Sequence, residues 1–368
     1  MKIPFADLQQ QYRNIKEEID QALLKVVGEA AFIKGKYLKS FEENFAAFCH
    51  ADFCIGTSSG TDALVAALKV ADIGPGDEVI VPANSFIATS EAVTLVGAQV
   101  IFADVSKDTY NLTLESVSKL LSEKTRAVIA VNLYGLAAPL KELKDLCSQN
   151  DLTFIQDSAQ AHGCYHANEP IAKYGDLLTF SFFPAKNLGA FGDAGCVVTN
   201  NSNYAKKLRM LIDHGRIDKY DHEFEGMNSR MDALQAAILD VKLKYLQIWT
   251  EKRQSLAKLY SSLLKDVEEI QLPSFPQKNE HVFHLFVIKT RSRDELKNYL
   301  QDAGIACGVH YPIALPFLKA YQHLNYFEND LPVCFENQNL VLSLPIYPEL
   351  DEESVKFICS KIKDFYNS

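Results

Sequence analysis

The first two thirds of the chain alternate short apolar runs with segments in which apolar residues recur at helical spacing. The apolar runs predict strands at 53–56, 77–83, 99–105, 126–135, 152–159, 177–183 and 195–200. Helices are predicted between the earlier strands, at 61–72, 86–96, 113–122 and 140–150. This order is typical of βαβ units, so we predict an α/β fold with a mostly parallel seven-stranded sheet. The glycine-rich link between the last two strands is too short for a helical crossover, which predicts one antiparallel strand.

The pattern changes near residue 240. It predicts a long helix with a charged face at 244–266, a strand at 282–290, a helix at 293–303, a strand at 305–311 and a closing helix at 351–366. Such a mixture is typical of a smaller α+β domain. We therefore predict a large α/β domain at residues 1–245 and a small C-terminal α+β domain at residues 246–368.

The composition excludes several classes of protein. Hydrophobic residues make up 48% of the 368 residues and charged residues 23%, as in ordinary globular proteins. A net charge of -10 without a basic patch argues against nucleic-acid binding. The chain shows neither an apolar run of membrane-spanning length nor a secretory signal, so we expect a cytoplasmic protein away from membranes. The 8 cysteines lack C-x-x-C spacing, so we interpret them as reduced core thiols and predict no metal site.

Residues that follow the predicted strands are the candidates for chemistry, because ligands of open α/β sheets bind at the carboxyl ends of the strands. The first strand ends in GTSSGTDAL (56–64), where small hydroxyl residues lead into a helix. Free N–H groups at a helix N-terminus suit a phosphate group. A helix N-cap and a turn explain the same residues without a ligand.

Asp157 ends the predicted strand in LTFIQDSAQAHG, where burial is expected. A buried carboxylate needs a partner, and the protonated ring nitrogen of a cofactor is one candidate. A helix N-cap or a structural salt bridge is the alternative. Gln160 follows three residues later and is expected to point the same way. We interpret His162, in the same stretch, as a hydrogen-bonded structural histidine rather than a base.

Lys186 is the one cation in the apolar stretch LLTFSFFPAKNLGAFGDAGCVV (177–198). Dry surroundings lower the pKa of an amine, and the neutral amine is a nucleophile. The flanking glycines are expected to let the backbone approach a flat ligand, and Ser181 to add a hydroxyl for a phosphate. The alternative is a lysine that reaches solvent from a tight turn. A phosphate turn, a buried acid and a Schiff-base lysine together describe a pocket for pyridoxal 5'-phosphate (PLP).

The chain resembles the DegT/DnrJ/EryC1/StrS family of PLP-dependent aminotransferases, which act on nucleotide-linked keto sugars. The resemblance rests on GTSSGTDAL, PANSFIATSEAV, QDSAQAHG, SFFPAKNLGAFGDAG, GMNSRMDALQAAIL and VHYPIALP, which follow the family's order over most of the chain. It implies a fold-type-I, aspartate aminotransferase-like architecture. It also implies that PLP takes an amino group from L-glutamate, becomes pyridoxamine phosphate (PMP), and passes the group to the sugar.

The resemblance implies roles for individual residues. Lys186 matches the lysine that binds the cofactor covalently and then shuttles the proton, and Asp157 matches the aspartate at the pyridine nitrogen. The other matches are Gly60, Thr61 and Ser181 for the phosphate, Gln160 for the phenolic oxygen, Phe86 for the ring face and Asn228 for the phosphate in the neighbouring subunit. The role of Asn228 implies a homodimer with shared sites. Core packing and a loop cap are the alternatives for Phe86 and Asn228.

Within the family, MKIPFADL, AKNLGAFGDAG and NSRMDALQAAIL look most like enzymes that aminate C3 of dTDP-linked 3-keto-6-deoxyhexoses. The residues expected near the sugar nucleotide are Lys219, Tyr220, His310 and Tyr311, with an exposed loop and a strand end as the alternative. Other functions to weigh are C4 amination of a UDP-, dTDP- or GDP-linked 4-keto sugar, a sugar dehydratase, which Lys186 argues against, and a non-catalytic PLP-binding regulator. Deoxyamino sugar biosynthesis for lipopolysaccharide or O-antigen is the expected pathway.

Four positions depart from the family's pattern. Phe183 replaces a common tyrosine, Pro316 and Asn132 replace frequent histidines, and Gln156 replaces a frequent glutamate. None removes the core chemistry. The changes at 183 and 316 bear on sugar recognition, because they alter the hydrogen-bonding groups available to a substrate.

Overall fold

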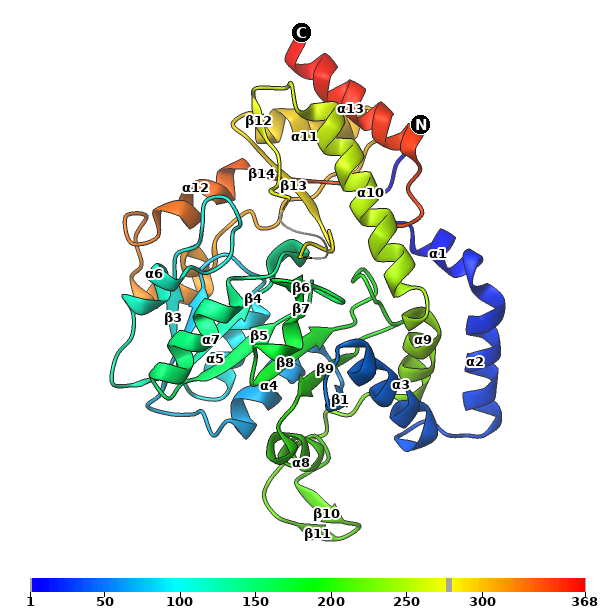
Figure 1. Cartoon of the computed structure of the whole chain (residues 1–368), viewed down its shortest axis with the longest axis vertical. Coiled ribbons are helices and arrows are strands. Elements are labelled where there is room, and N and C mark those ends of the chain that lie inside the picture. The colour runs from blue at the N-terminus through cyan, green and yellow to red at the C-terminus, as the bar shows by residue number, and fades with distance from the viewer. Residues whose placement is uncertain (1, 276–279, 368) are drawn as a thin grey trace.

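The computed structural model describes residues 2–275 and 280–367, and its centre is a seven-stranded sheet (Figure 1). The strands are β1 (Phe53–Thr57), β2 (Glu78–Pro82), β3 (Gln99–Ala103), β4 (Thr125–Val131), β5 (Thr153–Asp157), β8 (Leu177–Ser181) and β9 (Gly195–Thr199), in the order β1-β9-β8-β5-β4-β2-β3. Neighbours from β8 to β3 are parallel, whereas β9 is antiparallel to both β1 and β8. The predicted strands and the single antiparallel strand are confirmed.

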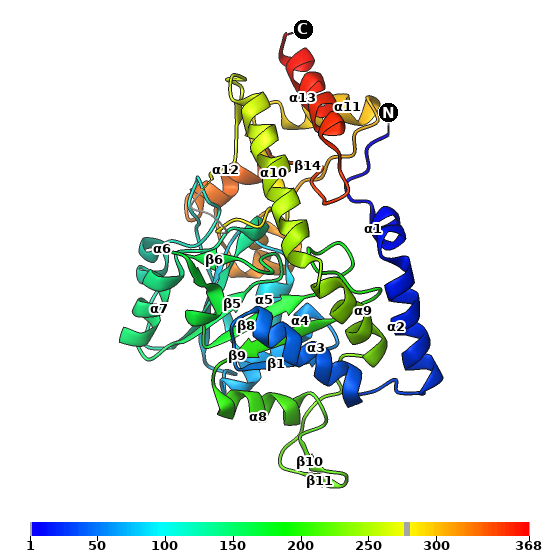
Figure 2. The same ribbon diagram turned by 45° about the vertical axis from the view of Figure 1, so that its right-hand side comes forward.

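Helices cover both faces of this sheet, which is why its strands read as almost continuous apolar runs (Figures 1 and 2). On β2, Ile80 packs into one core cluster and Val79 and Val81 pack into another on the opposite face. The first cluster includes α3 (Gly35–Phe48), α7 (Leu140–Gln149) and α9 (Ala233–Leu243), and the second includes α4 (Gly60–Val70), α5 (Ala88–Leu95) and α8 (Ser202–Leu211). The carboxyl ends of the strands therefore lie between two dry layers.

A three-stranded antiparallel sheet with its own core follows. It contains β12 (Ile270–Gln271), β13 (Phe286–Thr290) and β14 (Val341–Leu344), covered by α10 (Leu246–Leu264), α11 (Arg293–Asp302) and α13 (Glu352–Asn367). Ile3 from the N-terminus packs into the same core. The prediction of 1–245 and 246–368 as separate domains stays a prediction.

The strand predicted at 305–311 is wrong. Gly308 exchanges two backbone hydrogen bonds with Ser343, and the chain then leaves the sheet toward the carboxyl ends of the large sheet's strands. The third strand is β14 instead. The helix predicted at 244–266 is confirmed as α10, Leu246–Leu264, which begins directly after α9 ends at Leu243.

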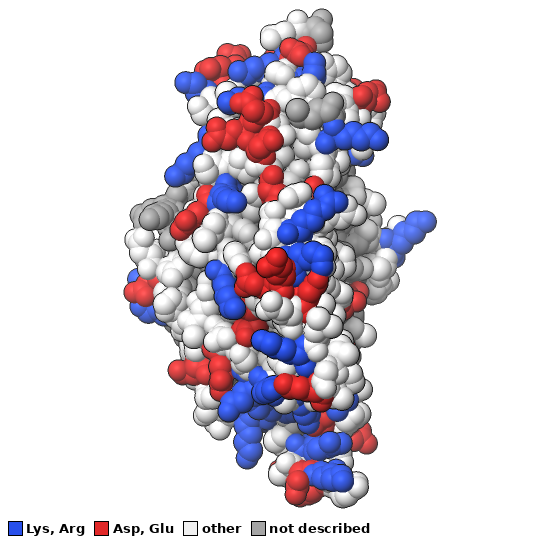
Figure 3. Space-filling model, turned by 90° about the vertical axis from the view of Figure 1, so that its right-hand side faces the viewer, with Lys and Arg blue, Asp and Glu red and all other residues white. Residues whose placement is uncertain are grey.

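The remaining elements lie around these two sheets. They are α1 (Leu8–Asn14), α2 (Lys16–Gly28), α6 (Leu114–Ser118), β6 (Tyr165–His166), β7 (Glu169–Pro170), β10 (Arg216–Asp218), β11 (Asp221–His222) and α12 (Pro332–Leu340), with 3-10 turns at Leu133–Gly135, Ile171–Lys173, Leu315–Phe317 and Lys319–Leu324. Figure 3 shows acidic and basic side chains interspersed over one face of the molecule. Within the described residues, no helix has the length and apolarity needed to cross a membrane.

Candidate active site

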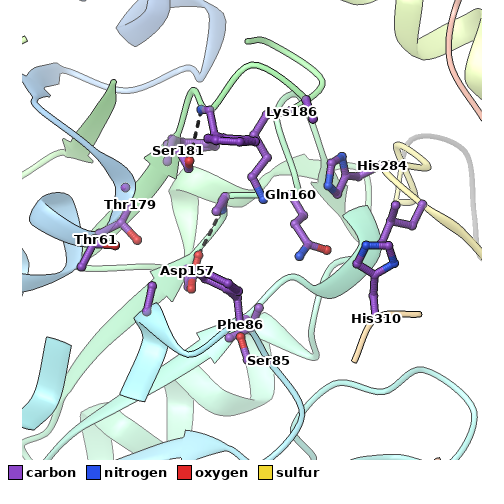
Figure 4. Close-up of a pocket in the computed structure, with 18 of the residues that line it drawn as sticks. Thr61, Ser85, Phe86, Asp157, Gln160, Thr179, Ser181, Lys186, His284 and His310 are labelled. Carbon is purple, nitrogen blue, oxygen red and sulfur yellow. Dashed lines mark hydrogen bonds between the residues drawn. The ribbon is translucent and has the colours of Figure 1, made fainter. Parts of the chain in front are cut away.

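A cavity of about 540 Å³ opens at the carboxyl ends of β5 and β8. Most of the predicted site residues meet on its wall: Gly60, Thr61, Phe86, Asp157, Gln160, Ser181, Lys186, His310 and Tyr311. In Figure 4, Lys186 and Asp157 point into the same space, and His284 and His310 lie along another side. The fold thus brings together residues that are more than two hundred positions apart in the chain, as the carboxyl-end rule predicts.

Lys186 lies in the loop between the antiparallel strands β8 and β9. Phe182 ties the base of this loop with two backbone hydrogen bonds of 2.8 Å, one to Ala194 and one from Ala190. Burial lowers the pKa of Lys186 to about 8, and the charge of Asp157 opposes this shift in part. The side chain is therefore a weakened base that borders the cavity, which is the state needed for a nucleophilic amine.

Asp157 is the last residue of β5 and is buried. Its Oδ2 accepts a hydrogen bond from Thr89 Oγ1 at 2.7 Å and its Oδ1 accepts one from the Ala159 N–H at 3.2 Å. Burial raises the pKa of Asp157, and these hydrogen bonds and Lys186 act against that rise. Among the described residues, no lysine, arginine or histidine forms an ion pair with Asp157. This buried anion suits a protonated pyridine nitrogen.

The turn before α4 supports both interpretations of its sequence. Ser59 is the N-cap, and its side chain accepts a hydrogen bond from the Asp62 N–H at 3.1 Å. Gly60 and Thr61 begin the helix and face the cavity beside Ser181. A Cβ on Gly60 would lie only 2.6 Å from the Cβ of Ser181. A small cradle at a helix N-terminus fits a phosphate group, and the absence of a side chain at Gly60 keeps it open.

Gly189, Gly192 and Gly195 are not among the residues that line the cavity, and their close contacts are with other parts of the protein. A Cβ on Gly189 would lie 2.2 Å from the carbonyl oxygen of Pro184, and one on Gly195 would lie 2.3 Å from that of Ser59. Gly192 packs against Gln235. These glycines let the protein's own backbone segments approach one another, which fixes the loop that carries Lys186.

Gln160 connects two walls of the cavity. Its Oε1 accepts a hydrogen bond from the Tyr134 N–H at 2.6 Å, and its Nε2 donates to Tyr311 Oη at 3.2 Å. Phe86 is 56% exposed and its ring centre lies 6.2 Å from that of Tyr311, so the alternative of core packing for Phe86 is wrong. His310 lies 2.8 Å from Ser343 through Nδ1, and burial lowers its pKa to about 4.

His162 is buried as predicted, but no hydrogen bond of normal geometry holds its ring. Neither ring nitrogen has a partner in the described structure, and the ring is surrounded by Phe45, Phe180 and Phe182. Burial lowers the pKa of His162 to about 3, although the backbone of Ser181 raises it in part. The imidazole is therefore neutral, and the expectation of a satisfied histidine is corrected to an apolar-packed one.

The remaining predicted residues lie outside this cavity. Lys219 and Tyr220 form the tip of the β10–β11 hairpin, which projects from the body of the molecule (Figure 1), and Tyr220 is 85% exposed. Asn228 is also exposed and forms a backbone bridge with Asp213. Within one chain, these three residues do not join the other site residues.

Sequence reasoning missed several residues of the cavity wall. They are Phe5, Ala6, Leu64, Ser85, Ala88, Val131, Ala159, Thr179, Phe180, Ala185, Asp193, Arg253, His284, Leu285 and Ile346. One signal was available for Arg253, because it lies four residues after Trp249 and three before Leu256 in the buried stripe of α10. A charge at such a position indicates a buried cation with a special environment.

The departures from the family's pattern separate in space. Phe183 borders the cavity, whereas Pro316 is buried outside the cavity wall. Asn132 Nδ2 donates to Gln156 Oε1 at 3.1 Å, so two of the departures contact each other. Two neutral amides therefore contact each other at the positions where the family's pattern often has a histidine and a glutamate.

A mostly parallel sheet with a weakened lysine and a buried aspartate at the ends of two neighbouring strands defines the class: the fold-type-I PLP-dependent transferases. The family model described as the DegT/DnrJ/EryC1/StrS aminotransferase family matches residues 13–363. The chain belongs to this family of aminotransferases.

Similar curated proteins carry both enzymatic and regulatory names. A pleiotropic regulatory protein of Geobacillus stearothermophilus is 39% identical, covering 100% of this chain and 99% of its own. The dTDP-3-amino-3,4,6-trideoxy-alpha-D-glucose transaminase of Streptomyces venezuelae is 38% identical, covering 99% and 96%. A UDP-N-acetyl-3-dehydro-alpha-D-glucosamine 3-aminotransferase of Acidithiobacillus ferrooxidans is 39% identical, covering 98% and 97%.

Solved structures agree with the fold over the whole chain. DesV of S. venezuelae has a TM-score of 0.97 at 38% identity, covering 100% of this chain and 99% of its own. The NtdA structure from Bacillus subtilis, described with bound cofactor PMP, has a TM-score of 0.94 at 31% identity, covering 100% and 86%.

Proposed function

We propose that this PLP-dependent aminotransferase takes an amino group from L-glutamate and places it on C3 of a dTDP-linked 3-keto-6-deoxyhexose. The observation that carries the proposal is the weakened amine of Lys186, which shares one cavity with the unpaired buried carboxylate of Asp157. The names of the S. venezuelae and A. ferrooxidans relatives both refer to an amino group at C3, which supports this carbon over C4.

The residues on the cavity wall fit the parts of PLP. The phosphate would be held by the cradle of Gly60, Thr61 and Ser181, and the ring face by Phe86. PLP, when bound, supplies a ring that accepts the electrons released as the donor's Cα–H bond breaks. Asp157 would keep a proton on the ring nitrogen, because its buried negative charge favours that proton.

Lys186 would also move the proton of the reaction. An amine with a pKa of about 8 is partly neutral near pH 7, so it can take a proton from the donor carbon and return it elsewhere. An amine with an ordinary lysine pKa of about 10.4 would be almost fully charged at that pH and a poorer base. The lowered pKa thus supports the double role of Lys186.

The protein is further proposed to be a homodimer in which Asn228 reaches the cofactor phosphate of the partner. Two observations support this assembly. Asn228 is exposed outside the cavity of its own chain. Large apolar side chains are also exposed in two segments: on α2 and the loop after it (Leu24, Val27, Phe32 and Ile33), and shortly before Asn228 in the sequence (Ile217, Tyr220 and Phe224). Lys34 pairs with Asp213, the bridge partner of Asn228, which joins the 32–34 segment to the Asn228 region. The partner's Lys219 and Tyr220 would then border the sugar nucleotide.

We further propose that the protein acts in the cytoplasm and makes deoxyamino sugars for lipopolysaccharide or O-antigen. The names of the enzymatic relatives support the amino-sugar part of this proposal. A UDP-linked 3-keto sugar is the second candidate substrate, because the A. ferrooxidans relative is named for one. The Geobacillus name keeps a regulatory role as a third possibility to test.

One experiment separates these candidates. Purified protein loaded with PLP is mixed first with L-glutamate and then with dTDP-, UDP- or GDP-linked 3-keto and 4-keto sugars, while absorbance and products are followed. Glutamate should bleach the cofactor band, and a dTDP-linked 3-keto sugar should restore it and yield a 3-amino sugar. Restoration by a 4-keto sugar alone would overturn the proposed position. A band that glutamate never bleaches would favour the regulator.

A further inference from the structure

Arg253 is a buried arginine on the wall of the cavity that the proposed function assigns to PLP. It lies on α10 in the stripe that includes Trp249, Leu256 and Tyr260, and only 6% of its surface is exposed. Its Nη1 donates to the carbonyl oxygens of Phe283, at 3.3 Å, and Ile346, at 2.6 Å. The guanidinium is therefore fixed by backbone atoms at a site that borders the cavity.

No carboxylate of the described residues forms an ion pair with Arg253. Its Nε is buried without a hydrogen-bond partner, and Nη2 makes no hydrogen bond within residues 2–275 and 280–367. Glu349 acts on its charge only from beyond ion-pair distance, and burial lowers the pKa of Arg253 to about 10. Other arginines of the chain are paired, such as Arg230 with Asp213 at 2.6 Å. A buried cation without a partner is costly, so this one has unused capacity to bind an anion.

The surroundings favour a small anion in this part of the cavity. His284 and His310 border the cavity with Arg253 and Lys186, whereas Asp157 and Asp193 are the acidic side chains on its wall. Burial, and then the charges of Lys186 and Arg253, hold the pKa of His284 well below its usual range. An anion bound beside Arg253 would meet a guanidinium fixed by backbone carbonyls and the neutral imidazole of His284.

We propose that Arg253 binds a carboxylate group of the amino donor. The inference rests on the proposed function, because it is that reaction which brings an amino acid into the cavity. Guanidinium N–H groups match a carboxylate, and Nη2 is the nitrogen of Arg253 that is neither hydrogen-bonded within the described residues nor closed off as Nε is. Donor binding at this point would leave Lys186 free to act on the donor's carbon.

The test uses Arg253→Lys and Arg253→Met in the PLP-loaded full chain. Arg293→Met is the matched control, because Arg293 is also buried and donates to a backbone carbonyl, that of Gln338, but does not border the cavity. The donor half-reaction is followed by bleaching of the cofactor band at rising L-glutamate. The sugar half-reaction is followed separately, starting from protein loaded with PMP.

The expected result is specific to the donor. Losing a hydrogen-bonded charge pair should raise the L-glutamate concentration for half-maximal bleaching about 10- to 100-fold, more for Met than for Lys. The sugar half-reaction should change less than about threefold, within ordinary context effects. Arg293→Met should lower the melting temperature without shifting the glutamate dependence.

Two further measurements complete the test. L-Glutamine and 4-aminobutyrate identify the carboxylate: a defect shared with L-glutamine assigns the α-carboxylate, and one shared only with 4-aminobutyrate assigns the side-chain carboxylate. Glutarate, a dicarboxylate that cannot react, should raise the melting temperature of the wild type and lose this effect in both Arg253 variants.

The inference fails if the Arg253 variants keep the wild-type dependence on L-glutamate and the wild-type shift with glutarate. It also fails if both half-reactions fall in parallel in Arg253→Lys, since that result assigns Arg253 a structural role. Failure of the wild type itself to bleach with L-glutamate would instead overturn the proposed function, so the two failures are distinguishable.

Discussion

Thr89 donates a hydrogen bond from Oγ1 to Oδ2 of Asp157 at 2.7 Å, although the two residues are 68 positions apart. Thr89 Oγ1 also lies 2.8 Å from the hydroxyl of Ser85, so a short chain of hydroxyl groups leads to the carboxylate. A hydrogen bond to the charged form of an acid lowers its pKa. Thr89 therefore helps to keep Asp157 ionised against the effect of burial.

Thr89→Val should raise the pKa of Asp157 further and weaken its hold on a protonated ring nitrogen. A hydrogen bond to a charged group contributes about 1.5–3 kcal/mol, so we expect PLP affinity to fall by roughly tenfold or more. Titration of apo-protein with PLP measures this change. Ser90→Ala is the control, because Ser90 is buried on the same helix but hydrogen-bonds to Ile87 and Tyr321 instead. Equal losses in both variants would contradict the role of Thr89.

The lowered pKa of Lys186 predicts how PLP attachment depends on pH. Only the neutral amine attacks the aldehyde, and the neutral fraction grows as pH rises toward the folded-state pKa of about 8. The attachment rate should therefore rise about tenfold per pH unit below pH 7 and level off above pH 8 to 9. Stopped-flow absorbance on apo-protein measures this rate. An inflection near the ordinary lysine value of about 10.4 would show that burial does not control this amine.

A substitution at Gly60 tests the phosphate cradle by filling the space that its missing side chain leaves. In Gly60→Ala, the new methyl group would lie 2.6 Å from Ser181 Cβ, so one of the two segments must shift. We expect PLP affinity to fall more than about tenfold, because the cradle must give up part of its geometry. Gly28→Ala is the control, since a Cβ there meets nothing within 4 Å. Gly28→Ala should leave PLP affinity unchanged and stabilise the helix slightly, as measured by thermal unfolding.

The shared-site dimer predicts complementation between Lys186→Ala and an Asn228→Ala variant whose own turnover is reduced. Lys186→Ala lacks the amine and should abolish turnover, and Asn228→Ala lacks the residue proposed to serve the partner's site. In a mixed dimer, the chain that keeps Lys186 receives Asn228 from the other chain. Refolding an equal mixture should restore about one quarter of wild-type activity, because random pairing makes half the dimers mixed, each with one complete site. No recovery in verified mixed dimers would contradict the shared site.

The strands of the large sheet could be predicted from the sequence because both faces of that sheet are buried. Strands such as β4 and β8 then read as apolar runs bounded by polar turns. The strand β14 could not be predicted in this way. It begins at Val341, directly after α12 ends at Leu340, so no turn residues in the sequence separate the helical pattern of α12 from the strand pattern of β14.

The site could be predicted where a residue's own neighbours in sequence carry the information. Asp157 and Lys186 follow apolar strands, and that position alone gives their burial and their direction. Thr89 carries no such signal, because its role depends on a contact with a distant segment. The position of Arg253 in the apolar stripe of α10 indicates burial, but its contacts with Phe283 and Ile346 are visible only in the structure. The hydrogen bond between Asn132 and Gln156, two of the residues that depart from the family's pattern, is likewise visible only in three dimensions.

The central claim is that Lys186 forms the covalent link to PLP. Reduction of PLP-loaded protein with borohydride fixes an imine between lysine and PLP, and peptide mass mapping then locates the adduct. The account predicts one pyridoxyl label, on the peptide that contains Lys186, and none on the Lys186→Ala variant. A label on another lysine, or no label in protein that retains bound PLP, would contradict it.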